Sequence, residues 1–388
     1  MKSPIVVCGT GIVGMALALT LARRGQAVTL LGPKLQIASA ETDDFHPRVY
    51  AISPASQLFL TEIGIWPLLP EARLTRVQAM EVYGDAGGRV DLSAWQDARS
   101  ELAWIVEASE LERALIQAVQ IVGVPWLSDK FSSIAQRTVT TFSGATLAAD
   151  LLVGADGAQS PVRQALQLST EEHAYGHTGV VAHFTSELPH LGAALQWFRQ
   201  EGVLALLPLP DTSAGHQVSM VWSLRDDLAN TLLALPFSDQ ADYLRNHLAL
   251  ATQGRLGELS LRSEVLGFPL VMSKSPMIGD GVALVGDAAH RIHPLAGQGL
   301  NLGLGDAQAL VSVISEREDF RSAGDPMVLR RYRRARAEHL MAMRWATDGL
   351  HRLFDNPSQP LSWVRNLGMD LVNKLPFIKR RIVSGASG

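Results

Sequence analysis

Residues 5–14 read IVVCGTGIVG, a β-rich apolar run that leads directly into a glycine-rich turn. Small and apolar residues follow at helical spacing from Met15 to Arg24, Gly25 ends them, and a second β-rich run covers Val28 to Leu31. The pattern predicts a strand–turn–helix–strand unit at the start of the chain. A βαβ unit of this kind is typical of an α/β fold with a parallel sheet.

The three glycines of the turn have separate physical roles in such a unit. Gly9 permits the tight turn, Gly11 lets the backbone approach a pyrophosphate, and Gly14 lets the helix pack close to the strand. The helix N-terminus adds N–H groups and a partial positive charge for the phosphates. The turn therefore predicts a Rossmann-like dinucleotide site, and the alternative is a turn that is glycine-rich only for packing.

One expected residue is missing from the unit. Its second strand normally ends in Asp or Glu, whose carboxylate binds the ribose hydroxyls. Here residues 30–34 read LLGPK, so Gly32 stands at that place. Lys34 suggests a 2′-phosphate and so NADP, whereas a solvated loop lysine is the alternative that we favour. How the ribose is held is left open.

Composition sets further bounds. The chain has 388 residues, 47% of them hydrophobic and 19% charged, which is enough for two packed domains or one large one. A net charge of -4 gives no reason to expect nucleic acid as a partner. The single cysteine, Cys8, excludes an intramolecular disulfide and fits a reducing cytoplasm. No apolar run approaches the roughly 20 residues of a membrane-spanning helix.

A second informative stretch, residues 285–301, reads VGDAAHRIHPLAGQGLN. A short strand leads into it, and a long helix is expected from about Leu300 to Ser315. The spacing of Asp287, His290 and His293 imitates a metal cluster, but no fourth ligand lies nearby in the sequence. We therefore expect no metal.

Taken together, these stretches resemble the class A flavoprotein monooxygenases, and within them the ubiquinone-biosynthesis hydroxylases of the 2-polyprenylphenol group. The resemblance covers nearly the whole chain, in the same order. It is carried by residues 9–14, 48–53, 104–107, 154–163, 285–301 and 373–380.

The resemblance implies a fold. It is an α/β fold with a Rossmann-like FAD-binding domain similar to that of para-hydroxybenzoate hydroxylase, an inserted β-sheet substrate domain and a helical C-terminus. The expected bounds are 1–75, 100–177 and 269–320 for the discontinuous FAD-binding domain, 76–99 and 178–268 for the substrate domain, and 321–388 for the helical region. Five arginines between Arg330 and Arg336 are expected on an exposed helix face.

The resemblance also implies the cofactor site. Asp287 would accept a hydrogen bond from the FAD ribityl chain, Arg48 would lie by the pyrophosphate or the isoalloxazine, and Asp156 would serve FAD and the nicotinamide cofactor. A flavin-side turn would comprise Pro294, Gly297, Gln298 and Gly299. The full implied cofactor set is Gly9, Gly11, Gly14, Arg48, Asp156, Gly157, Asp287, Gly297, Gly299, Leu300 and Asn301.

Three of these residues have plain structural alternatives. Asp287 would only cap a helix beginning at Ala288. Asp156 would be a turn residue ahead of Gly157, with Arg163 supporting the loop. Arg48 would pair with Asp43 or Asp44 on the surface.

The implied activity is hydroxylation of the aromatic ring of a polyprenyl-phenol intermediate of ubiquinone biosynthesis. NAD(P)H reduces FAD, and O₂ then forms a flavin C4a-hydroperoxide that attacks the electron-rich ring. No side chain emerges as a base for the phenol. His183 and His216 lie in the expected substrate domain, where lone histidines are more often structural or exposed.

Two other functions stay open at this point. One is a flavin monooxygenase acting on a soluble aromatic acid, and the other is a catalytically idle flavoprotein scaffold of a quinone-synthesis complex. Residues 361–381 combine apolar and basic side chains, which suits either peripheral contact with an anionic membrane or docking on the chain's own domain. We expect a cytoplasmic protein, peripheral on the inner face of the cytoplasmic membrane in the first case, and leave homo-oligomer formation open.

Overall fold

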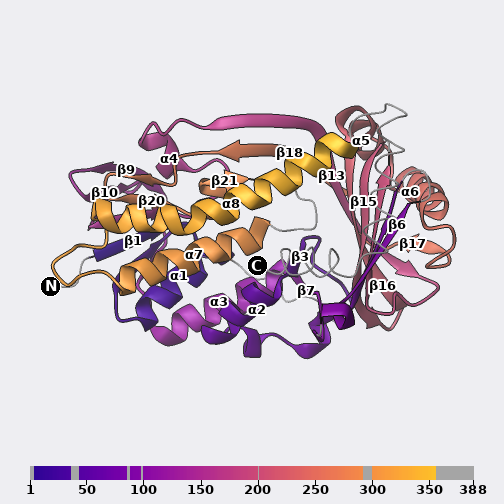
Figure 1. Ribbon diagram of the computed structural model, residues 1–388, viewed down its shortest axis with the longest axis horizontal. Helices are drawn as coiled ribbons and strands as arrows, with labels where there is room; N and C mark the ends of the chain where they lie inside the picture. Colours follow the sequence, from indigo (N-terminus) through magenta and orange to yellow (C-terminus); the bar gives the residue numbers. More distant parts are fainter. Residues whose placement is uncertain are drawn as a thin grey trace.

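The computed structural model describes residues 4–35, 43–84, 88–97, 99–199, 201–291 and 299–354. Two parts lie side by side along the long axis, one built on a parallel sheet with helices and the other on a large antiparallel sheet (Figure 1). Strands β13 (Glu171–Ser186) and β18 (Leu266–Lys274) and helix α8 (Pro326–Phe354) extend from one part towards the other.

The remaining helices belong to one or the other of the two parts. They are α1 (Ile12–Arg23), α2 (Pro54–Glu62), α3 (Ala108–Val122), α4 (Pro161–Ala165), α5 (Asp226–Leu233), α6 (Phe237–Thr252) and α7 (Gly299–Ser315). Short 3₁₀ turns are η1 (Trp66–Leu68), η2 (Glu71–Arg73), η3 (Ala94–Asp97) and η4 (Gly286–Ala288). The helix expected after the glycine turn is thus α1, and that expected at about 300–315 is α7.

The first part is built on a six-stranded sheet of order β19-β20-β12-β1-β2-β8. Its strands are β1 (Pro4–Cys8), β2 (Ala27–Leu31), β8 (Trp126–Leu127), β12 (Leu151–Gly154), β19 (Ile278–Gly279) and β20 (Val282–Leu284). The four central strands run parallel, and Leu31, Cys8, Gly154 and Leu284 are in register across them. The turns that follow these strands therefore meet at one edge of the sheet.

Helix α1 is buried along its length because it lies between this sheet and other helices. Every residue from Gly14 to Leu21 is buried, and α1 packs against α3 and α7. Helix α8 packs on α7, which extends the layer outward (Figure 1). A small antiparallel sheet of β9 (Phe131–Ala135), β10 (Thr138–Thr141) and β11 (Thr146–Ala148) adjoins β1.

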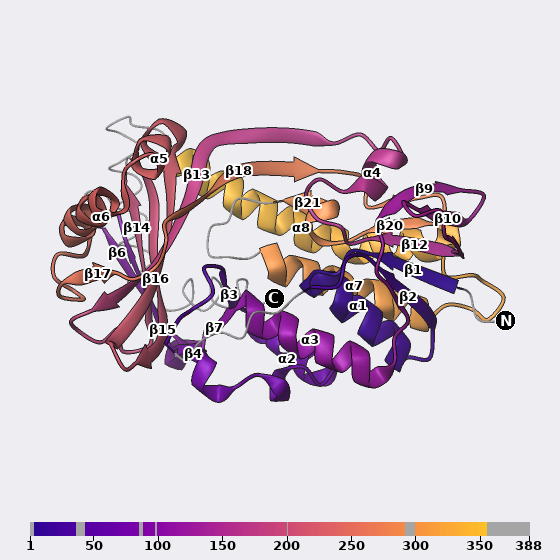
Figure 2. The same ribbon diagram turned by 180° about the vertical axis from the view of Figure 1, so that it is seen from behind.

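The second part is a nine-stranded sheet of order β21-β18-β13-β16-β15-β14-β5-β6, with β17 paired to β13. Its other strands are β5 (Ala79–Tyr83), β6 (Arg89–Ser93), β14 (Ala193–Arg199), β15 (Gly202–Thr212), β16 (Gly215–Arg225), β17 (Leu259–Leu261) and β21 (His290–Arg291). Helices α5 and α6 cover its outer face, where Val180, Phe184 and Trp222 pack in one apolar core (Figure 2). The inner face looks toward the first part.

A three-stranded sheet joins the two parts. Its strands are β3 (Val49–Ile52), β4 (Leu74–Val77) and β7 (Ala103–Glu107), in the order β3-β7-β4. Val77 and Ile105 of this sheet share an apolar core with Ala194 and Leu209 of the large sheet. The parts are thus held by packed side chains as well as by continuous strands.

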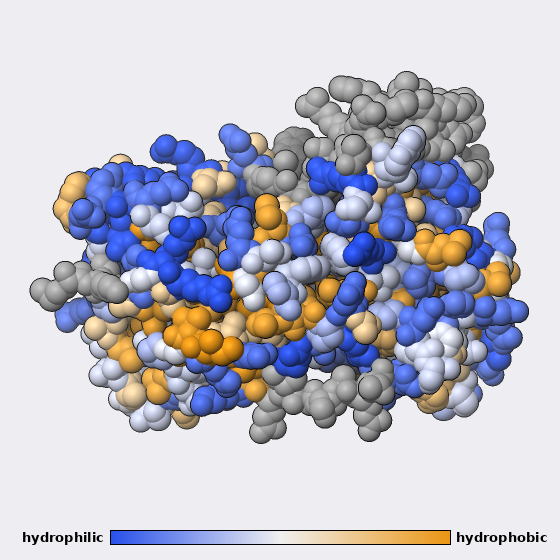
Figure 3. Space-filling model, turned by 90° about the horizontal axis from the view of Figure 1, so that it is seen from below, coloured by the Kyte–Doolittle hydropathy of each residue, from blue (hydrophilic) through white to orange (hydrophobic). Residues whose placement is uncertain are grey.

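The α/β fold with an attached β-sheet part and a C-terminal helix confirms the predicted fold class. No helix within the described ranges is long and apolar enough to cross a bilayer. The face seen in Figure 3 mixes hydrophilic with hydrophobic side chains. Residues 361–381, for which a membrane contact is predicted, lie outside the described ranges.

Candidate active site

The glycine-rich turn lies between β1 and α1, and its three glycines differ in what surrounds them. A Cβ on Gly9, where φ is +121°, would lie 2.1 Å from the Ala155 carbonyl oxygen, and one on Gly14 would lie 2.1 Å from the Gly9 oxygen. A Cβ on Gly11 would meet nothing within 4 Å. Gly9 and Gly14 are therefore required by packing, whereas Gly11 faces open space through which a ligand can approach the backbone.

The N-terminus of α1 is left open to that same space. Gly11 is its N-cap, no side chain caps it, and no acidic residue stands in its first turn. The first N–H groups of a helix lack intrahelical partners and carry a partial positive charge. This end of α1 is suited to an anion such as a pyrophosphate.

Asp156 follows β12 at the same edge of the sheet. Its Oδ2 accepts a hydrogen bond from the Val162 N–H at 3.0 Å and so supports the first turn of α4, whose N-cap is Ser160. Its Oδ1, however, is buried and has no hydrogen-bond partner among the described residues, and burial raises the pKa of the carboxyl. The turn that follows uses Gly157 at φ +81°. A buried acceptor without a partner is costly unless a ligand or water supplies a donor.

Asp287 lies in η4, directly after β20. Its side chain has a part that is open to solvent. The surrounding protein nevertheless removes water from the carboxyl group, and this desolvation raises its pKa. The positive charges of Arg291, His290 and Arg48 oppose that rise. The alternative that Asp287 caps a helix beginning at Ala288 is wrong, because η4 ends there and strand β21 follows.

Arg163 joins the Asp156 turn to the Asp287 turn. Its buried guanidinium donates to the carbonyl of Ala158 at 2.6 Å and to that of Ala288 at 3.0 Å. The two acidic turns are consequently fixed relative to each other.

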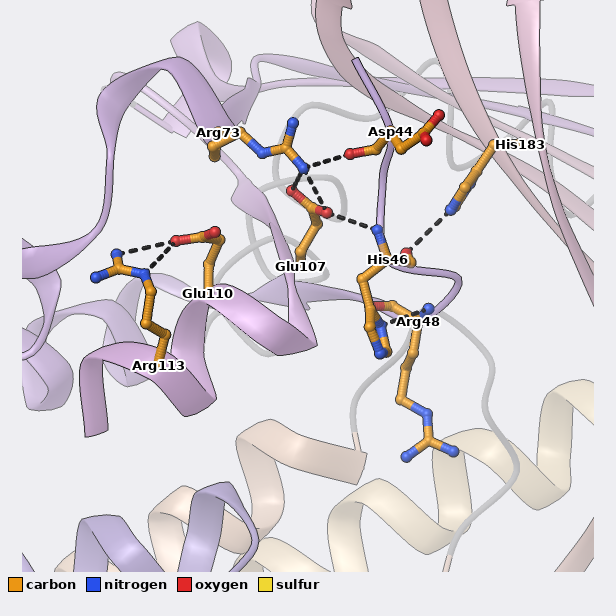
Figure 4. Close-up of polar contacts among 8 residues, drawn as sticks. All are labelled: Asp44, His46, Arg48, Arg73, Glu107, Glu110, Arg113 and His183. Carbon is orange, nitrogen blue, oxygen red and sulfur yellow. Dashed lines mark hydrogen bonds and ion pairs between the residues drawn. The ribbon is translucent and has the colours of Figure 1, made fainter. Parts of the chain in front are cut away.

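Arg48 points toward this site and away from Asp44 (Figure 4). Its guanidinium lies 5.4 Å from the centre of the Phe268 ring, and its charge acts on Asp287. Asp43, the other partner considered for a surface pair, hydrogen-bonds Ser213 instead. Arg48 therefore lies where the two parts of the molecule face each other.

The N-terminal residues of α7 complete the described part of the site. Gly299 and Leu300 begin the helix, and Asn301 uses its side-chain amide to join α7 to the segment after Arg48. Its Oδ1 accepts from the Ser53 N–H at 3.0 Å and its Nδ2 donates to the Ala51 carbonyl at 2.8 Å. Pro294, Gly297 and Gln298 lie outside the described residues.

Comparison with known proteins agrees with this geometry. The FAD binding domain family matches residues 2–346. Ubiquinone hydroxylase UbiL of Rhodospirillum rubrum is 31% identical over 396 residues, which cover 99% of this chain and 89% of UbiL. The 3-demethoxyubiquinol 3-hydroxylase of Escherichia coli is 31% identical over 399 residues, which cover 99% of this chain and 98% of that enzyme.

The chain belongs to the FAD-dependent hydroxylases of ubiquinone biosynthesis. Among solved structures, PqsL of Pseudomonas aeruginosa, a probable FAD-dependent monooxygenase, has the same fold with a TM-score of 0.76. The two are 21% identical, and the match covers 95% of this chain and 100% of PqsL.

The described residues fit FAD. Gly11 leaves room for a ligand beside an uncapped helix N-terminus, and Asp156 keeps a buried acceptor without a partner. Both features lie at the edge where the Asp287 turn also lies, since β1, β12 and β20 are in register.

The missing acid at the end of β2 has a steric explanation in this hydroxylase. Gly32 adopts φ +153°, and a Cβ there would lie 2.7 Å from Cγ2 of Thr10. Thr10 is itself fixed, because its hydroxyl donates to the Pro33 carbonyl at 2.8 Å. The Gly32 carbonyl accepts from Nε1 of Trp126 at 3.0 Å. Thr10 thus occupies the space that the first atoms of an acidic side chain would need.

A buried ionic cluster behind the site was not predicted from the sequence. Asp306 on α7 is fully buried; its Oδ2 accepts from the Gly286 N–H at 2.9 Å and contacts Nε2 of His290 at 2.7 Å. Its Oδ1 accepts from Nε of Arg336 on α8 at 2.6 Å. Burial alone would raise the pKa of Asp306, but His290 and Arg336 hold it below its usual range.

The expectation that the arginines of α8 all lie on an exposed face is therefore wrong for Arg336. Its side chain is 8% exposed, and its guanidinium also donates to the Leu302 carbonyl at 3.0 Å. Gly305 makes room for it, since a Cβ there would lie 3.0 Å from the guanidinium. The spacing of Asp306 and Arg336 in the sequence carries no signal of this contact.

We predict that Asp306→Ala lowers the free energy of unfolding by about 3–5 kcal/mol, because it leaves Arg336 buried and unpaired. Urea unfolding measures this loss of stability. The control is Glu318→Gln, which breaks the half-exposed ion pair between Glu318 and Arg331. The wild type should lose the contribution of Asp306 as the pH falls below the ordinary aspartate range, since its folded pKa is lowered. Equal stability of the two variants would contradict the role given to Asp306.

A second prediction concerns Gly32. Gly32→Ala should lower the free energy of unfolding by roughly 1–3 kcal/mol, because of both its φ and its contact with Thr10. The same change at Gly25, where φ is +74° and no atom lies within 4 Å of a Cβ, measures the cost of a milder positive φ without a steric contact. Adding Thr10→Ser should recover part of the loss at Gly32. No difference between the two glycine variants in thermal unfolding would rule out the steric explanation.

Proposed function

We propose that this enzyme hydroxylates the aromatic ring of a polyprenyl-phenol intermediate of ubiquinone biosynthesis, with FAD as cofactor and NAD(P)H and O₂ as co-substrates. The observation that carries the substrate proposal is an apolar row on the inner face of the large sheet. Val181, Ala205 and Val221 lie on three neighbouring strands there, in one lateral row. All three are only half-buried, and Phe268 on β18 is 39% exposed beside Arg48.

The apolar row supports a ring with a hydrocarbon tail more than a soluble aromatic acid. A carboxylate ligand needs a cation in its binding site. The central segments of β13, β15 and β16, residues 179–185, 203–209 and 217–223, contain no lysine or arginine on either face. Arg48, the cation beside Phe268, is assigned to the cofactor. The relatives that this chain resembles are a ubiquinone hydroxylase and a 3-demethoxyubiquinol 3-hydroxylase by name, which also favours a prenylated ring.

The idle-scaffold alternative rested on the missing acid at Gly32. Because Thr10 fills that position, glycine is required by packing and is no sign of a decayed site. The same edge of the sheet also has two features that suit a cofactor. They are the open space beside Gly11 and the buried acceptor Oδ1 of Asp156.

FAD, when bound, supplies the redox chemistry that activates oxygen. The N-terminus of α1 and the Gly11 backbone would bind the pyrophosphate, while Asp156 Oδ1 would accept from a cofactor hydroxyl. Asp287 would accept a hydrogen bond from the ribityl chain, and Arg48 would add positive charge beside it. Gly9, Gly14 and Gly157 shape the turns, and Asn301 positions the segment after Arg48. The backbone N–H groups of Gly299 and Leu300, at the positive end of α7, would face the flavin.

Contact of residues 361–381 with an anionic membrane, or assembly into a quinone-synthesis complex, stays a prediction from the sequence. Those residues lie outside the described ranges.

A direct test is turnover of a phenol with a short prenyl tail by the purified FAD enzyme. We expect NAD(P)H oxidation to be stimulated by that phenol, and mass spectrometry to find one oxygen from ¹⁸O₂ in its ring. 4-Hydroxybenzoate, a soluble aromatic acid, serves as the matched comparison and should stimulate little. Preference for the acid, or no ring oxygen with either compound, would overturn the substrate proposal.

The role of Asp287 gives a further prediction. Asp287→Asn should weaken FAD binding roughly 10-fold or more, because a charge-assisted hydrogen bond is lost. Binding to the wild type should also weaken as the pH falls through the raised pKa of Asp287, whereas the variant should not show this dependence. Quenching of flavin fluorescence measures both, and Asp129→Asn, at a half-buried carboxylate between β8 and β9, is the control. An unchanged affinity would remove Asp287 from the site.

A further inference from the structure

The inner face of the large sheet carries polar as well as apolar residues, among them His183 opposite Ser219 and, in the next row, Thr185 opposite Gln217. Val180, Ala182 and Phe184 of β13 belong to the outer core, so the residues between them, including His183, point inward. His183 lies directly opposite Ser219 of β16, and directly opposite residues of an antiparallel pair share a face. The pair is thus in the lateral row next to Val181 and Val221.

Both side chains are buried and carry an atom without a partner. His183 is 3% exposed and Ser219 is 0% exposed. Among the described residues, neither Nδ1 of His183 nor Oγ of Ser219 has a hydrogen-bond partner. Each such atom costs free energy unless a ligand or a water completes its hydrogen bonds, so two of them in one row indicate a place for a polar group.

The contacts of His183 decide which ring nitrogen carries the proton. Nε2 lies 3.0 Å from the carbonyl oxygen of His46 (Figure 4). A carbonyl only accepts, so Nε2 donates, and in the neutral ring Nδ1 then holds a lone pair. The nitrogen without a partner is the one that can accept a proton.

The ring is held in this orientation from the first part of the molecule. The His46 N–H donates to Oε2 of Glu107 at 2.6 Å, and Glu107 in turn forms an ion pair with Arg73 at 2.7 Å (Figure 4). Phe45 lies edge-on to the imidazole with ring centres 6.2 Å apart. The segment that precedes Arg48 therefore fixes the position of His183.

The surroundings of His183 favour the neutral ring. Burial lowers its pKa, and the nearby His46 ring lowers it further, against the opposing effect of the bond to the His46 carbonyl. Of the charged groups on adjoining elements, Glu107 is paired with Arg73 and the Arg262 guanidinium contacts the Thr212 hydroxyl. Before substrate binds the imidazole is therefore neutral and oriented, as a proton acceptor must be. A phenolate formed beside it would stabilise the imidazolium, because an opposite charge within about 4–6 Å favours the charged form.

We propose that Nδ1 of His183 and Oγ of Ser219 bind the hydroxyl group of the phenol substrate, and that Nδ1 takes its proton. The O–H bond breaks, its electron pair stays on oxygen, and the proton forms an N–H bond, giving a phenolate and an imidazolium. The phenolate ring is richer in electrons and so more reactive toward an electrophilic oxygen. This inference rests on the proposed function, because it requires a phenol on the apolar row.

The test follows the ionisation of a bound phenol without turnover. The probe is 2-geranyl-4-nitrophenol, whose phenolate absorbs visible light and whose neutral form does not. It is titrated into the FAD enzyme under nitrogen, without reductant, at a pH below the pKa of the free probe. We expect the wild type to convert the bound probe to phenolate and His183→Gln to bind it largely in the neutral form. Gln keeps a donor for the His46 carbonyl but offers no base.

Turnover provides the second readout and the controls. His183→Gln should lower kcat by roughly 100-fold, with a smaller change in KM and unchanged FAD binding. Ser219→Ala should chiefly raise KM. His216→Gln is the matched control, since His216 is half-exposed on the same strand as Ser219 and contacts Asp211.

The outcomes separate the two proposals. A wild type that binds FAD but not the probe overturns the proposed substrate class, and the role of His183 with it. A wild type that hydroxylates the probe while His183→Gln ionises it equally well overturns only the role of His183. The same holds if the phenolate signal or kcat changes no more in His183→Gln than in His216→Gln, as for an imidazole that only binds a buried water.

Discussion

The parallel register of four strands is the constraint on which the site depends. Because Leu31, Cys8, Gly154 and Leu284 lie side by side, the turns that follow them are brought to one edge of the sheet. Only glycine fits at position 9, directly after β1, because a Cβ there would overlap the Ala155 carbonyl of the neighbouring turn. The open helix N-terminus and the two acidic turns are near one another for this reason. Ligands of open α/β sheets bind at such carboxyl ends.

The layers behind this edge hold it in place. Arg163 joins the two acidic turns, and Asp306 fixes the Gly286 backbone to α7 and, through Arg336, to α8. In front of the edge, the inner face of the large sheet supplies an apolar row with His183 and Ser219 beside it. The segment that carries His46 and Arg48 contacts both sides, so cofactor edge and substrate face are positioned by one stretch of chain.

The elements that could be predicted from the sequence are those whose pattern lies within one short stretch of the chain. Helical spacing and the glycines gave α1 and α7 to within a few residues, and the steric roles of Gly9 and Gly14 follow from the turn itself. The reason for Gly32 could not be read from the sequence, because it depends on where Thr10 lies after folding. Arg336 resembled a surface arginine, since nothing in a helix sequence marks which cation will meet a buried carboxylate 30 positions away.

The same limit applies to His183, which looks like any lone histidine in a β-rich segment until strand pairing places it opposite Ser219.

We propose that the turns after β1, β12 and β20 bind FAD together. Amide hydrogen exchange of the protein with and without FAD tests this most directly. We expect slower exchange on FAD binding in residues 9–14, 155–163 and 286–291, and no change in the β9–β11 sheet. Protection confined to other segments, or absent from one of the three turns, would contradict it.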